Sequence, residues 1–361
     1  MTRLRVDVDA SAISANAAQL ARVLGRSELW AVVKADGYGH GALRSARAAL
    51  AGGASRIAVA TLDEGLALRR ALGADVAIIV LGPLEPGRAR EAFGLELCLS
   101  TPDGLRELGA ASFRGIVHVK ADTGMGRWGL APPDALALGR SLAAGEVAGV
   151  TLGGLMSHLA NADAPDPAHL RLQTARFAEL AASFPPCPRH LANSAGALWH
   201  PETRLDAARC GIALFGVAPD DGDASGDGLR PALRVASTVV AVRTLAPGES
   251  SGYGRRLIAA AETRVATIPV GYADGYPRAL SGRADVLVRG RRCRVAATVS
   301  MDALSVVVDR DVEVGDEVVL LGDQGSERIR AEELARQAGT IGYEICCGFR
   351  ERAWRSEQWS P

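Results

Sequence analysis

The 361-residue sequence predicts an α/β protein with an N-terminal (β/α)8 TIM-type barrel and a C-terminal mostly-β domain. From Leu29 onward, short apolar runs alternate with Ala/Leu/Arg-rich segments of about 10–15 residues, which is the spacing of βα units. Roughly seven or eight such units precede residue 217 and favour a closed barrel over a doubly wound sheet. The alternation alone does not decide between these two folds.

The first predicted strand covers Leu4–Asp9, where apolar and polar residues alternate. Ser11 is expected to cap the following helix, whose apolar face has near-helical spacing at residues 13, 17, 20 and 24. Thr61 and Glu64 match a capping box at the start of another helix, and Pro102 is expected at a first helical position. The barrel strands are predicted at residues 30–34, 56–60, 76–81, 95–97, 115–120, 150–157 and 189–192.

The pattern changes near residue 217, and the Asp/Gly/Ser-rich residues 220–228 predict a linker or an exposed loop. Beyond the linker, strands follow closely at residues 235–242, 264–270, 286–295 with a turn at Gly290, 304–308 and 317–321, with one helix near residues 331–338. We therefore expect residues 1–10 to form a strand that joins the β domain. Residues 11–230 should form the barrel, and residues 231–361 the β domain.

Composition excludes several classes of protein. Basic and acidic residues number 41 each, so the basic excess typical of nucleic-acid binders is absent. The longest apolar run, near Val76–Leu81, is far shorter than the roughly 20 residues of a membrane span. The N-terminal residues lack the apolar core of a signal peptide, and the six cysteines form no CxxC pair. We expect a cytoplasmic protein with reduced thiols, no metal site, and no binding to membrane or nucleic acid.

Lys34 is the strongest candidate for chemistry. It ends a predicted apolar strand, and active-site residues of barrels collect at the carboxyl ends of the strands. Burial there would lower the pKa of the amine and make it a nucleophile able to form a Schiff base with an aldehyde cofactor. The glycine-rich residues 35–41 that follow predict a tight polar loop. The competing interpretation is a strand-end lysine that extends to water.

A second glycine-rich segment matches the dinucleotide-binding pattern GxGxxG at residues 124–129. A dinucleotide site requires a helix to begin at this pattern. Pro132 and Pro133 follow instead, and the segment lies in the middle of the chain. We therefore do not assign a dinucleotide site.

The lysine segment KADGYGHG at residues 34–41 resembles the pyridoxal-phosphate motif of the alanine racemase family, which has the type III fold. Further resemblances follow in family order at residues 120–129 (KADTGMGRWG), 190–194, 209–212, 251–254, 271–276, 300–302 and 341–344. The resemblance spans nearly the whole chain. It implies an isomerase that uses pyridoxal 5'-phosphate to interconvert L-alanine and D-alanine. It also implies a cytoplasmic homodimer that supplies D-alanine for cell-wall peptidoglycan.

The resemblance implies which residues contact the cofactor. Lys34 would anchor it through a Schiff base. Arg209 would face the pyridine nitrogen, and His158 would lie beside the ring and contact Arg209. Because a guanidinium only donates hydrogen bonds, the ring nitrogen would stay unprotonated, which limits transamination. The phosphate would take hydroxyl or backbone N–H donors from Tyr38, Ser194, Gly211, Ile212 and Tyr343.

Racemisation requires a base on each face of the substrate's Cα, because one base would return the proton to the face it came from. The resemblance gives this role to Lys34 for D-alanine and to Tyr253 for L-alanine, with Tyr253 acting on the partner chain's site. The phenol's reference pKa is about 10, so cationic neighbours such as Arg must lower it or speed the recovery of the base. A sheet tyrosine with an exposed hydroxyl is the simpler interpretation.

The resemblance also implies the substrate contacts. Arg127 would contact the cofactor's phenolic oxygen and the substrate carboxylate, and Met301 would offer its backbone N–H to that carboxylate. Lys120, which is often carbamylated in the family, would hold Arg127 in place. Supporting and entrance positions that leave room for only a small side chain would be Tyr272, Asp274, Arg278 and Asp302.

This sequence departs from the family pattern at two positions. Thr298 stands where relatives often have an arginine, and Gly252 precedes Tyr253. Two other functions remain as alternatives: a non-catalytic barrel that binds pyridoxal phosphate, and a type III amino-acid decarboxylase. Residues 231–361, which include Tyr253, disfavour the first. The second usually has a glycine-rich phosphate loop and a cysteine from the partner subunit, and neither is recognised here.

Overall fold

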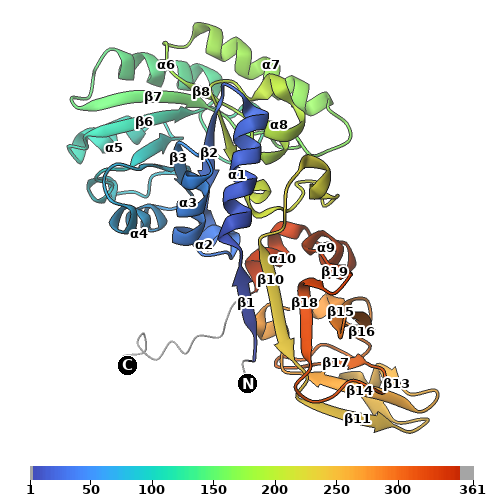
Figure 1. Cartoon of the computed structure of the whole chain (residues 1–361). Helices are drawn as coiled ribbons and strands as arrows, with labels where there is room; N and C mark the ends of the chain where they lie inside the picture. The colour runs from blue at the N-terminus through green and yellow to red at the C-terminus, as the bar shows by residue number, and fades with distance from the viewer. Residues whose placement is uncertain (1–2, 350–361) are drawn as a thin grey trace, which may run out of the picture. The chain divides into compact units, whose positions relative to one another are not determined.

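The computed structural model describes residues 3–349, and the described chain divides into two compact units (Figure 1). The barrel unit comprises residues 10–220 and 224–230. The second unit contains the described residues before residue 10, residues 221–223, and the described residues from 231 onward.

Parallel strands of the barrel unit close into a ring and confirm the predicted fold class. In the described chain the ring runs in order through β2 (Glu28–Val32), β3 (Arg56–Val59), β4 (Ala77–Val80), β5 (Glu96–Leu99), β6 (Gly115–Lys120), β7 (Val150–Met156), β8 (Arg189–His190) and β9 (Ala207–Cys210). The last strand pairs with the first, with Arg209 opposite Trp30. Strands such as β3 and β4 are rich in apolar and β-branched residues, because both of their faces are covered, one by the barrel interior and the other by helices.

Helices cover the outside of the ring (Figure 1). They are α1 (Ala10–Leu24), α3 (Ala42–Ala51), α4 (Leu62–Leu72), α5 (Gly104–Ala110), α6 (Pro132–Ala143), α7 (Ala168–Ser183) and α8 (Ser194–Trp199), and a short α2 (Lys34–Tyr38) follows β2. The predicted capping box of Thr61 and Glu64 is present at α4. Two predicted helix starts are wrong. Ser11 lies inside α1, which begins at Ala10, and Pro102 lies in the turn before α5, which begins at Gly104.

The second unit is built from antiparallel strands. Its larger sheet has the order β1 (Arg5–Val8), β10 (Leu233–Thr238), β18 (Glu317–Gln324), β15 (Asp285–Val288), β16 (Arg291–Arg294), with β19 (Glu327–Ile329) also on β18. A smaller sheet orders β11 (Ala241–Leu245), β14 (Thr263–Ile268) and β17 (Leu304–Val307), and β12 (Ser250–Ser251) pairs with β13 (Leu257–Ile258). Two helices, α9 (Ala331–Ala338) and α10 (Gly342–Gly348), complete this unit in the described chain.

The single strand predicted at residues 235–242 is wrong, because the chain changes sheets within it. Residues up to Thr238 pair with β18, and residues from Ala241 pair with β14. Between them, the Val239 N–H donates to Asp316 O and the Val240 N–H donates to Thr267 O. The apolar pattern continues through this point, because it reports burial and not the identity of the neighbouring strand.

The turn predicted at Gly290 is confirmed. It joins β15 to β16, with φ of 50° at Arg289 and 71° at Gly290. Positive φ at both central residues is the geometry that matches the right-handed twist of a two-residue hairpin.

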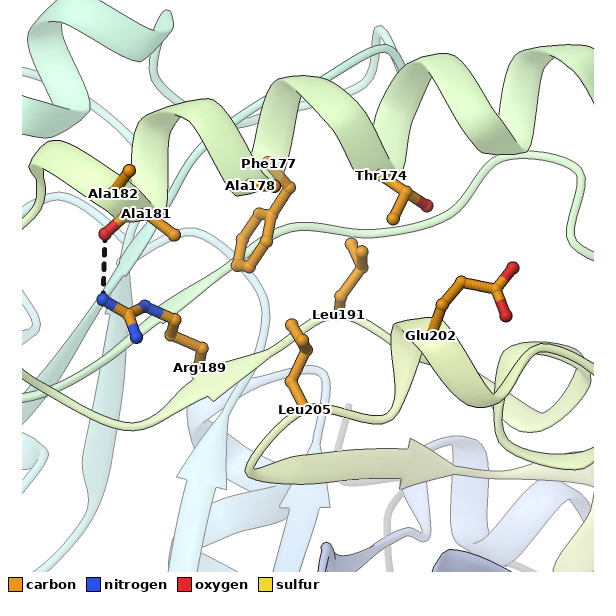
Figure 2. A pocket seen from close by; sticks show the side chains of 9 residues that line it. All are labelled: Thr174, Phe177, Ala178, Ala181, Ala182, Arg189, Leu191, Glu202 and Leu205. Carbon is orange, nitrogen blue, oxygen red and sulfur yellow. Dashed lines mark hydrogen bonds between the residues drawn. The ribbon is translucent and has the colours of Figure 1, made fainter.

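One pocket lies on the outer surface of the barrel, between α7 and the segments around β8 (Figure 2). Its volume is about 320 Å³, and apolar side chains such as Phe177, Leu191 and Leu205 line much of it. Among the described residues, no helix is long and apolar enough to cross a bilayer, and no cluster of His, Cys, Asp and Glu side chains could hold a metal ion.

Candidate functional site

Most of the candidate residues of the barrel unit lie at the carboxyl ends of its strands. Lys34 follows β2, Lys120 ends β6, and His158 follows β7. Ser194 follows β8, and Arg209 is in β9, just before Gly211 and Ile212. The ring closure brings these residues to one end of the barrel although up to 178 positions separate them in the sequence.

The backbone after Lys34 forms a left-handed turn. Ala35, Asp36 and Tyr38 have φ of 52°, 52° and 53°, and Gly37 between them has φ of 64°. A left-handed helical conformation costs an L-residue other than glycine roughly 1–2 kcal/mol. The predicted tight loop is therefore confirmed in a strained form that its surroundings must stabilise.

Side chains next to the turn supply part of that stabilisation. The Asp36 carboxylate accepts a hydrogen bond from the Ala42 N–H at 2.7 Å. The His40 Nδ1 lies 3.0 Å from the carbonyl oxygens of both Gly37 and Tyr38, and its ring stacks on Phe215 with centroids 4.2 Å apart. Burial lowers the pKa of His40 to about 4, so the imidazole is neutral and its Nδ1–H serves these carbonyls.

Neutral donors converge next to this turn. The Ser194 Oγ accepts hydrogen bonds from the backbone N–H groups of Gly211 at 3.0 Å and Ala213 at 3.4 Å. A Cβ at Gly211 would meet the Tyr38 hydroxyl at 2.3 Å, so the glycine backbone and the phenol are in direct contact. Asn193, and not Ser194, caps α8 by accepting from the Gly196 N–H. The Ser194 hydroxyl proton is therefore available for a bound group.

Arg209 is almost completely buried, with 3% of its surface exposed. Its Nη1 donates to His190 Nδ1 at 2.9 Å and to His190 O at 2.8 Å. Its Nη2 donates to the carbonyls of Ser157 and Leu191 and lies 3.4 Å from His158 Nδ1. Burial lowers the pKa of Arg209 to about 10, so the guanidinium is charged at neutral pH. Among the contacts of the described residues, none uses Nε.

A buried hydrogen-bonded chain continues from Arg209 into the barrel interior. His190 Nε2 lies 3.1 Å from His118 Nδ1, and His118 Nε2 lies 2.9 Å from Glu96 Oε2. Because a guanidinium only donates, His190 Nδ1 must accept, and the proton of this imidazole is then on Nε2. The His190 Nε2–H donates to His118 Nδ1, and the His118 Nε2–H donates to the Glu96 carboxylate. The chain thus runs from Arg209 through two neutral histidines to a carboxylate, which Arg56 pairs with at 3.3 Å.

A glycine in β7 makes room for the two imidazoles. A Cβ at Gly154 would lie 2.7 Å from His118 Nδ1 and 3.2 Å from His190 Nε2. Trp30 packs against both imidazoles, with centroids 5.6 Å from that of His118 and 4.3 Å from that of His190. The contact of His118 with His190 therefore depends on the missing side chain at residue 154.

Positive charge accumulates at this end of the barrel. Burial lowers the pKa of His158 well below its usual value, and Arg209, Lys120, Arg127 and Lys34 all add to that effect through their charges. Burial, with Arg209 and Arg127, also lowers the pKa of Lys120 to about 8. A partly buried site with this many cations stabilises anionic groups such as phosphate and carboxylate.

A compact loop presents Arg127. The Asp122 carboxylate accepts hydrogen bonds from three successive backbone N–H groups, at residues 124, 125 and 126, at 2.8, 2.8 and 2.9 Å. The Lys120 amine lies 4.6 Å from the centroid of the Trp128 ring, and the guanidinium carbon of Arg127 lies 4.1 Å from it. No helix begins at residues 124–129, in agreement with the rejection of a dinucleotide site.

The second unit holds the remaining candidates. Tyr253 is 74% exposed, in a short 3-10 turn between β12 and β13. The Thr298 hydroxyl donates to Tyr253 O at 2.8 Å. Gly252 has φ of 76°, and a Cβ at this residue would lie only 2.9 Å from the Ala297 Cβ, which is too close. The two departures from the family pattern thus adjoin the same tyrosine and shape its backbone.

Other residues of the second unit lie close to one another. The buried Asp274 carboxylate accepts from the Gly271 N–H at 2.8 Å and pairs with Arg3 at 3.2 Å. Arg3 also donates to Asp302 O at 2.8 Å. The Ala273 N–H donates to Met301 O, which joins the segments around Tyr272 and Met301, both of which are exposed. Arg278 begins a 3-10 turn, and Tyr343 is the second residue of α10.

The sequence analysis missed the interior polar chain. His118 lies two residues before Lys120 in β6, and alternate residues of a strand share a face. That spacing could have placed His118 in the barrel interior. No comparable signal exists for Glu96, whose partners come from other strands.

The fold and this site define a class: a barrel protein with lysine, arginine and hydroxyl side chains that suit an anionic ligand at the carboxyl ends of its strands. The chain belongs to the alanine racemase family. A family profile described as "Alanine racemase, N-terminal domain" matches residues 8–219, and one described as "Alanine racemase, C-terminal domain" matches residues 232–357. An alanine racemase from Symbiobacterium thermophilum is 47% identical, over 97% of this chain and 95% of the relative.

Solved structures agree with this assignment. The crystal structure of alanine racemase from the D-cycloserine producer Streptomyces lavendulae has a TM-score of 0.92 and 37% identity, covering 98% of this chain and 96% of that one. Alanine racemase from Bartonella henselae, solved with covalently bound pyridoxal phosphate, has a TM-score of 0.88 and 27% identity, covering 98% of each chain. The family is an isomerase family that depends on pyridoxal phosphate.

The residues at the carboxyl ends of the barrel strands fit this cofactor. The amine of Lys34 can react with an aldehyde, and Tyr38, Ser194 and the Gly211 backbone form a neutral cradle suited to a phosphate. Arg209 is a buried donor that cannot give up its proton near neutral pH. The donor set therefore matches a ligand with an aldehyde, an anionic phosphate and an acceptor nitrogen.

Proposed function

We propose that this chain interconverts L-alanine and D-alanine with the help of pyridoxal 5'-phosphate. The observation that carries the proposal is the cationic end of the barrel, where Lys34 on its left-handed turn adjoins the cradle of Tyr38, Ser194 and Gly211. The product D-alanine would serve cell-wall peptidoglycan, and the protein would act in the cytoplasm. Residues 11–230 would form the barrel domain that carries the cofactor, and residues 231–361 the mostly-β domain that carries the second base.

Lys34 would hold the cofactor covalently. Ser194, Tyr38 and the backbone of Gly211 and Ile212 would bind its phosphate, joined by Tyr343. When bound, the cofactor draws electrons away from the substrate's Cα and so makes the Cα–H acidic. Arg209 would donate to the ring nitrogen without protonating it, and His158 would support Arg209. Water exclusion by the buried walls strengthens each of these interactions.

Two bases on opposite faces of Cα would move the proton. The amine of Lys34 would take the Cα proton of D-alanine, and the phenolate oxygen of Tyr253 would take that of L-alanine. Whichever base does not take the proton returns one from its own side, so the configuration inverts. Tyr253 would serve the site of the partner subunit in a homodimer.

Arg127 would bind the substrate carboxylate together with the Met301 N–H, and Lys120 would hold Arg127. With a pKa of about 8, an appreciable fraction of Lys120 is a neutral amine at physiological pH, and a neutral amine can add carbon dioxide. Carbamylation would convert the repulsion between Lys120 and Arg127 into an ion pair. Carbon-13 NMR of protein equilibrated with labelled bicarbonate should give a carbamate signal that is absent from Lys120→Ala.

The proposal also covers the access route. Tyr272, Asp274 and Arg278 would border the substrate entrance and admit only a small side chain, with Asp302 in a supporting position. Activity with alanine should therefore exceed activity with larger amino acids, which a comparison of kcat/KM across amino acids measures.

The decisive experiment incubates the full-length protein with L-alanine in D₂O. We expect deuterium at Cα of both enantiomers together with a visible absorption band from the lysine-bound cofactor. Lys34→Ala should lose the band, whereas Tyr253→Phe should keep it and lose most of the inversion. Release of carbon dioxide would instead indicate a decarboxylase, and a band without exchange at Cα would indicate a non-catalytic cofactor-binding barrel.

Subunit mixing tests the partner role of Tyr253. A hybrid of Lys34→Ala and Tyr253→Phe subunits has one site with both bases only if Tyr253 acts across the dimer. Mixed and reassembled variants should then recover activity that neither variant has alone. If each site used the Tyr253 of its own chain, every site in the hybrid would lack one base and no activity would return.

A further inference from the structure

The Glu64 carboxylate connects the start of α4 with the left-handed turn that follows Lys34. Glu64 Oε2 accepts hydrogen bonds from the backbone N–H groups of Ala60 at 2.9 Å and Thr61 at 3.1 Å, which forms its half of the α4 capping box. Glu64 Oε1 accepts from the Ala35 N–H at 2.7 Å. Ala35 directly follows Lys34 and begins the left-handed turn. The two oxygens of one side chain thus connect β3 and α4 with the turn after β2.

This connection acts where the backbone is strained. Ala35 has φ of 52°, a left-handed conformation that brings the Cβ of an L-residue too close to the following carbonyl oxygen. The turn behind it is closed by backbone bonds from the Gly37 N–H to Val33 O at 2.8 Å and from the Gly39 N–H to Ala35 O at 3.1 Å. A strained conformation persists only when its surroundings favour it over the relaxed alternatives. The Glu64 contact fixes the first peptide of the turn.

A carboxylate suits this position better than its neutral amide. Three N–H groups point at the two oxygens of Glu64, and an ionised carboxylate only accepts. A glutamine can present one oxygen, and its NH₂ must then face an N–H donor on the other side. Replacement by glutamine therefore preserves size but loses either the contact with Ala35 or the contact with the cap.

We propose that Glu64 is a positioning residue for Lys34, holding the left-handed turn that sets where the lysine amine lies. The cofactor part of this inference rests on the proposed function, because it assumes that Lys34 anchors pyridoxal phosphate. The backbone part does not. Glu64 touches neither the cofactor nor the substrate in this role, and it acts through the peptide of Ala35.

Thr61 provides the matched control. Its hydroxyl accepts from the Glu64 N–H at 3.3 Å and completes the same capping box without reaching Ala35. Thr61→Ala therefore weakens the α4 cap and leaves the carboxylate on the turn. If Glu64 only capped α4, Thr61→Ala and Glu64→Gln would have the same effects on residues 35–41.

Hydrogen exchange of the full-length protein is the first test. In Glu64→Gln we expect the amides of Gly37, Gly39 and Gly41 to exchange at least about tenfold faster than in the parent. In Thr61→Ala the same amides should exchange at the parent rate. Equal acceleration in Glu64→Gln and Thr61→Ala would overturn the proposal. So would the absence of acceleration in both Glu64→Gln and Glu64→Ala, because Glu64→Ala removes the contact with Ala35 outright.

A rescue separates turn geometry from any general loss of stability. Glycine adopts positive φ without the penalty of a Cβ. Ala35→Gly added to Glu64→Gln should therefore bring the exchange at residues 37–41 back toward the parent rate, although the cap stays impaired. Failure of this rescue would show that the strain at residue 35 is not what Glu64 opposes.

The cofactor measurement completes the design. Glu64→Gln should lose bound pyridoxal phosphate about tenfold faster on dilution, whereas Thr61→Ala should lose it at the parent rate. The decay of the visible absorption band measures both rates. Unchanged cofactor loss together with faster exchange would overturn the link to Lys34. A parent protein that takes up no cofactor would instead contradict the proposed function and leave the exchange result intact.

Discussion

Charged side chains form connected networks in two parts of the molecule that differ in their access to water. In the barrel interior, Glu96, His118, His190 and Arg209 form one chain, and each is 7% exposed or less. At the β15–β16 hairpin of the second unit, Arg291 and Arg292 pair with acidic residues that include Asp311, Glu327 and Glu333. Both networks have close contacts, some below 3 Å.

The difference teaches that geometry does not set the energetic importance of an ion pair. A buried polar group that loses its partner has no water to replace it, and the loss costs about 1–3 kcal/mol, or more for a charge. An exposed ion pair is worth about 0–1 kcal/mol, because water solvates the separated groups. The interior chain should therefore be sensitive to every member, whereas the hairpin should tolerate the loss of one.

Lowering the pH should have the largest effect on the free energy of unfolding, and that effect should come from buried histidines. Burial lowers the pKa of His40 to about 4, and burial is also the main cause of the lowered pKa values of His118, His158 and His190. Above the unfolded pKa of about 6.5, these histidines are neutral in both states and contribute no pH dependence. As pH falls below 6.5, the unfolded chain binds protons that the folded chain does not. For His40 the free energy of unfolding should then fall by about 2 kcal/mol by pH 5, and His118, His158 and His190 should lower it further in the same direction.

Calorimetry in buffers of different ionisation enthalpy measures this proton uptake directly. Unfolding at pH 5.5 should take up about one proton at His40 and further protons at His118, His158 and His190. His40→Gln should lower the uptake by about one, because it removes one of these groups. An uptake near zero in the parent would mean that the interior histidines are already protonated, and the assigned directions of donation would be wrong.

Removal of the carboxylate at the end of the interior chain should have the next largest effect. Glu96→Leu leaves the His118 Nε2–H without its acceptor and Arg56 without one of its carboxylates. We expect a loss of about 3 kcal/mol in the free energy of unfolding, measured by urea denaturation. The matched variant is Glu327→Leu, which removes one partner of Arg292 in the hairpin. It should cost less than about 1 kcal/mol, because Arg292 keeps its ion pair with Glu333. Similar costs for both variants would contradict the importance of burial.

A single methyl group should disturb the same chain. Gly154→Ala places a Cβ 2.7 Å from His118 Nδ1, and backbone carbonyl Pro188 O at 2.9 Å restricts any relief. We expect a loss of about 1–3 kcal/mol from overpacking. Nitrogen NMR of the histidines should also show a changed environment at His118 and His190. Gly226→Ala is the control, because a Cβ there would meet open space and the residue does not have a left-handed conformation. Gly226→Ala should leave both measurements unchanged.

Local patterns in the sequence predicted the elements and the fold class. The rhythm of apolar runs favoured the barrel without deciding against a doubly wound sheet. The capping box of Thr61 and Glu64 was correct because it depends on residues three apart. The turn at Gly290 was correct for the same reason. The Ser11 and Pro102 starts were wrong because one favourable residue does not fix a helix boundary.

Interactions between distant residues could not be predicted in this way. Glu96, His118 and His190 come from separate strands, and only closure of the barrel makes them neighbours. The second contact of Glu64, with Ala35, is likewise invisible, because the local pattern accounts for only one of its oxygens. The position of Lys34 at the end of a strand marked it as a candidate, whereas the roles of Tyr253 and Arg127 came from resemblance to a family. All three remain predictions about roles.

Arg291→Ala at the hairpin should have the smallest effect of all. Its guanidinium pairs with Asp311 at 2.6 Å and with Asp309 at 3.5 Å, and these contacts raise its pKa and lower that of Asp311. Both groups are exposed, so water replaces the lost partner, and Arg289 lies 3.6 Å from Asp311 and keeps a cation beside that carboxylate. Urea denaturation should show no resolvable change at low salt, and 0.5 M salt should not alter that result because there is little attraction left to screen. A clear destabilisation that disappears in salt would mean that the hairpin charges cooperate, and that exposure alone does not separate the two networks.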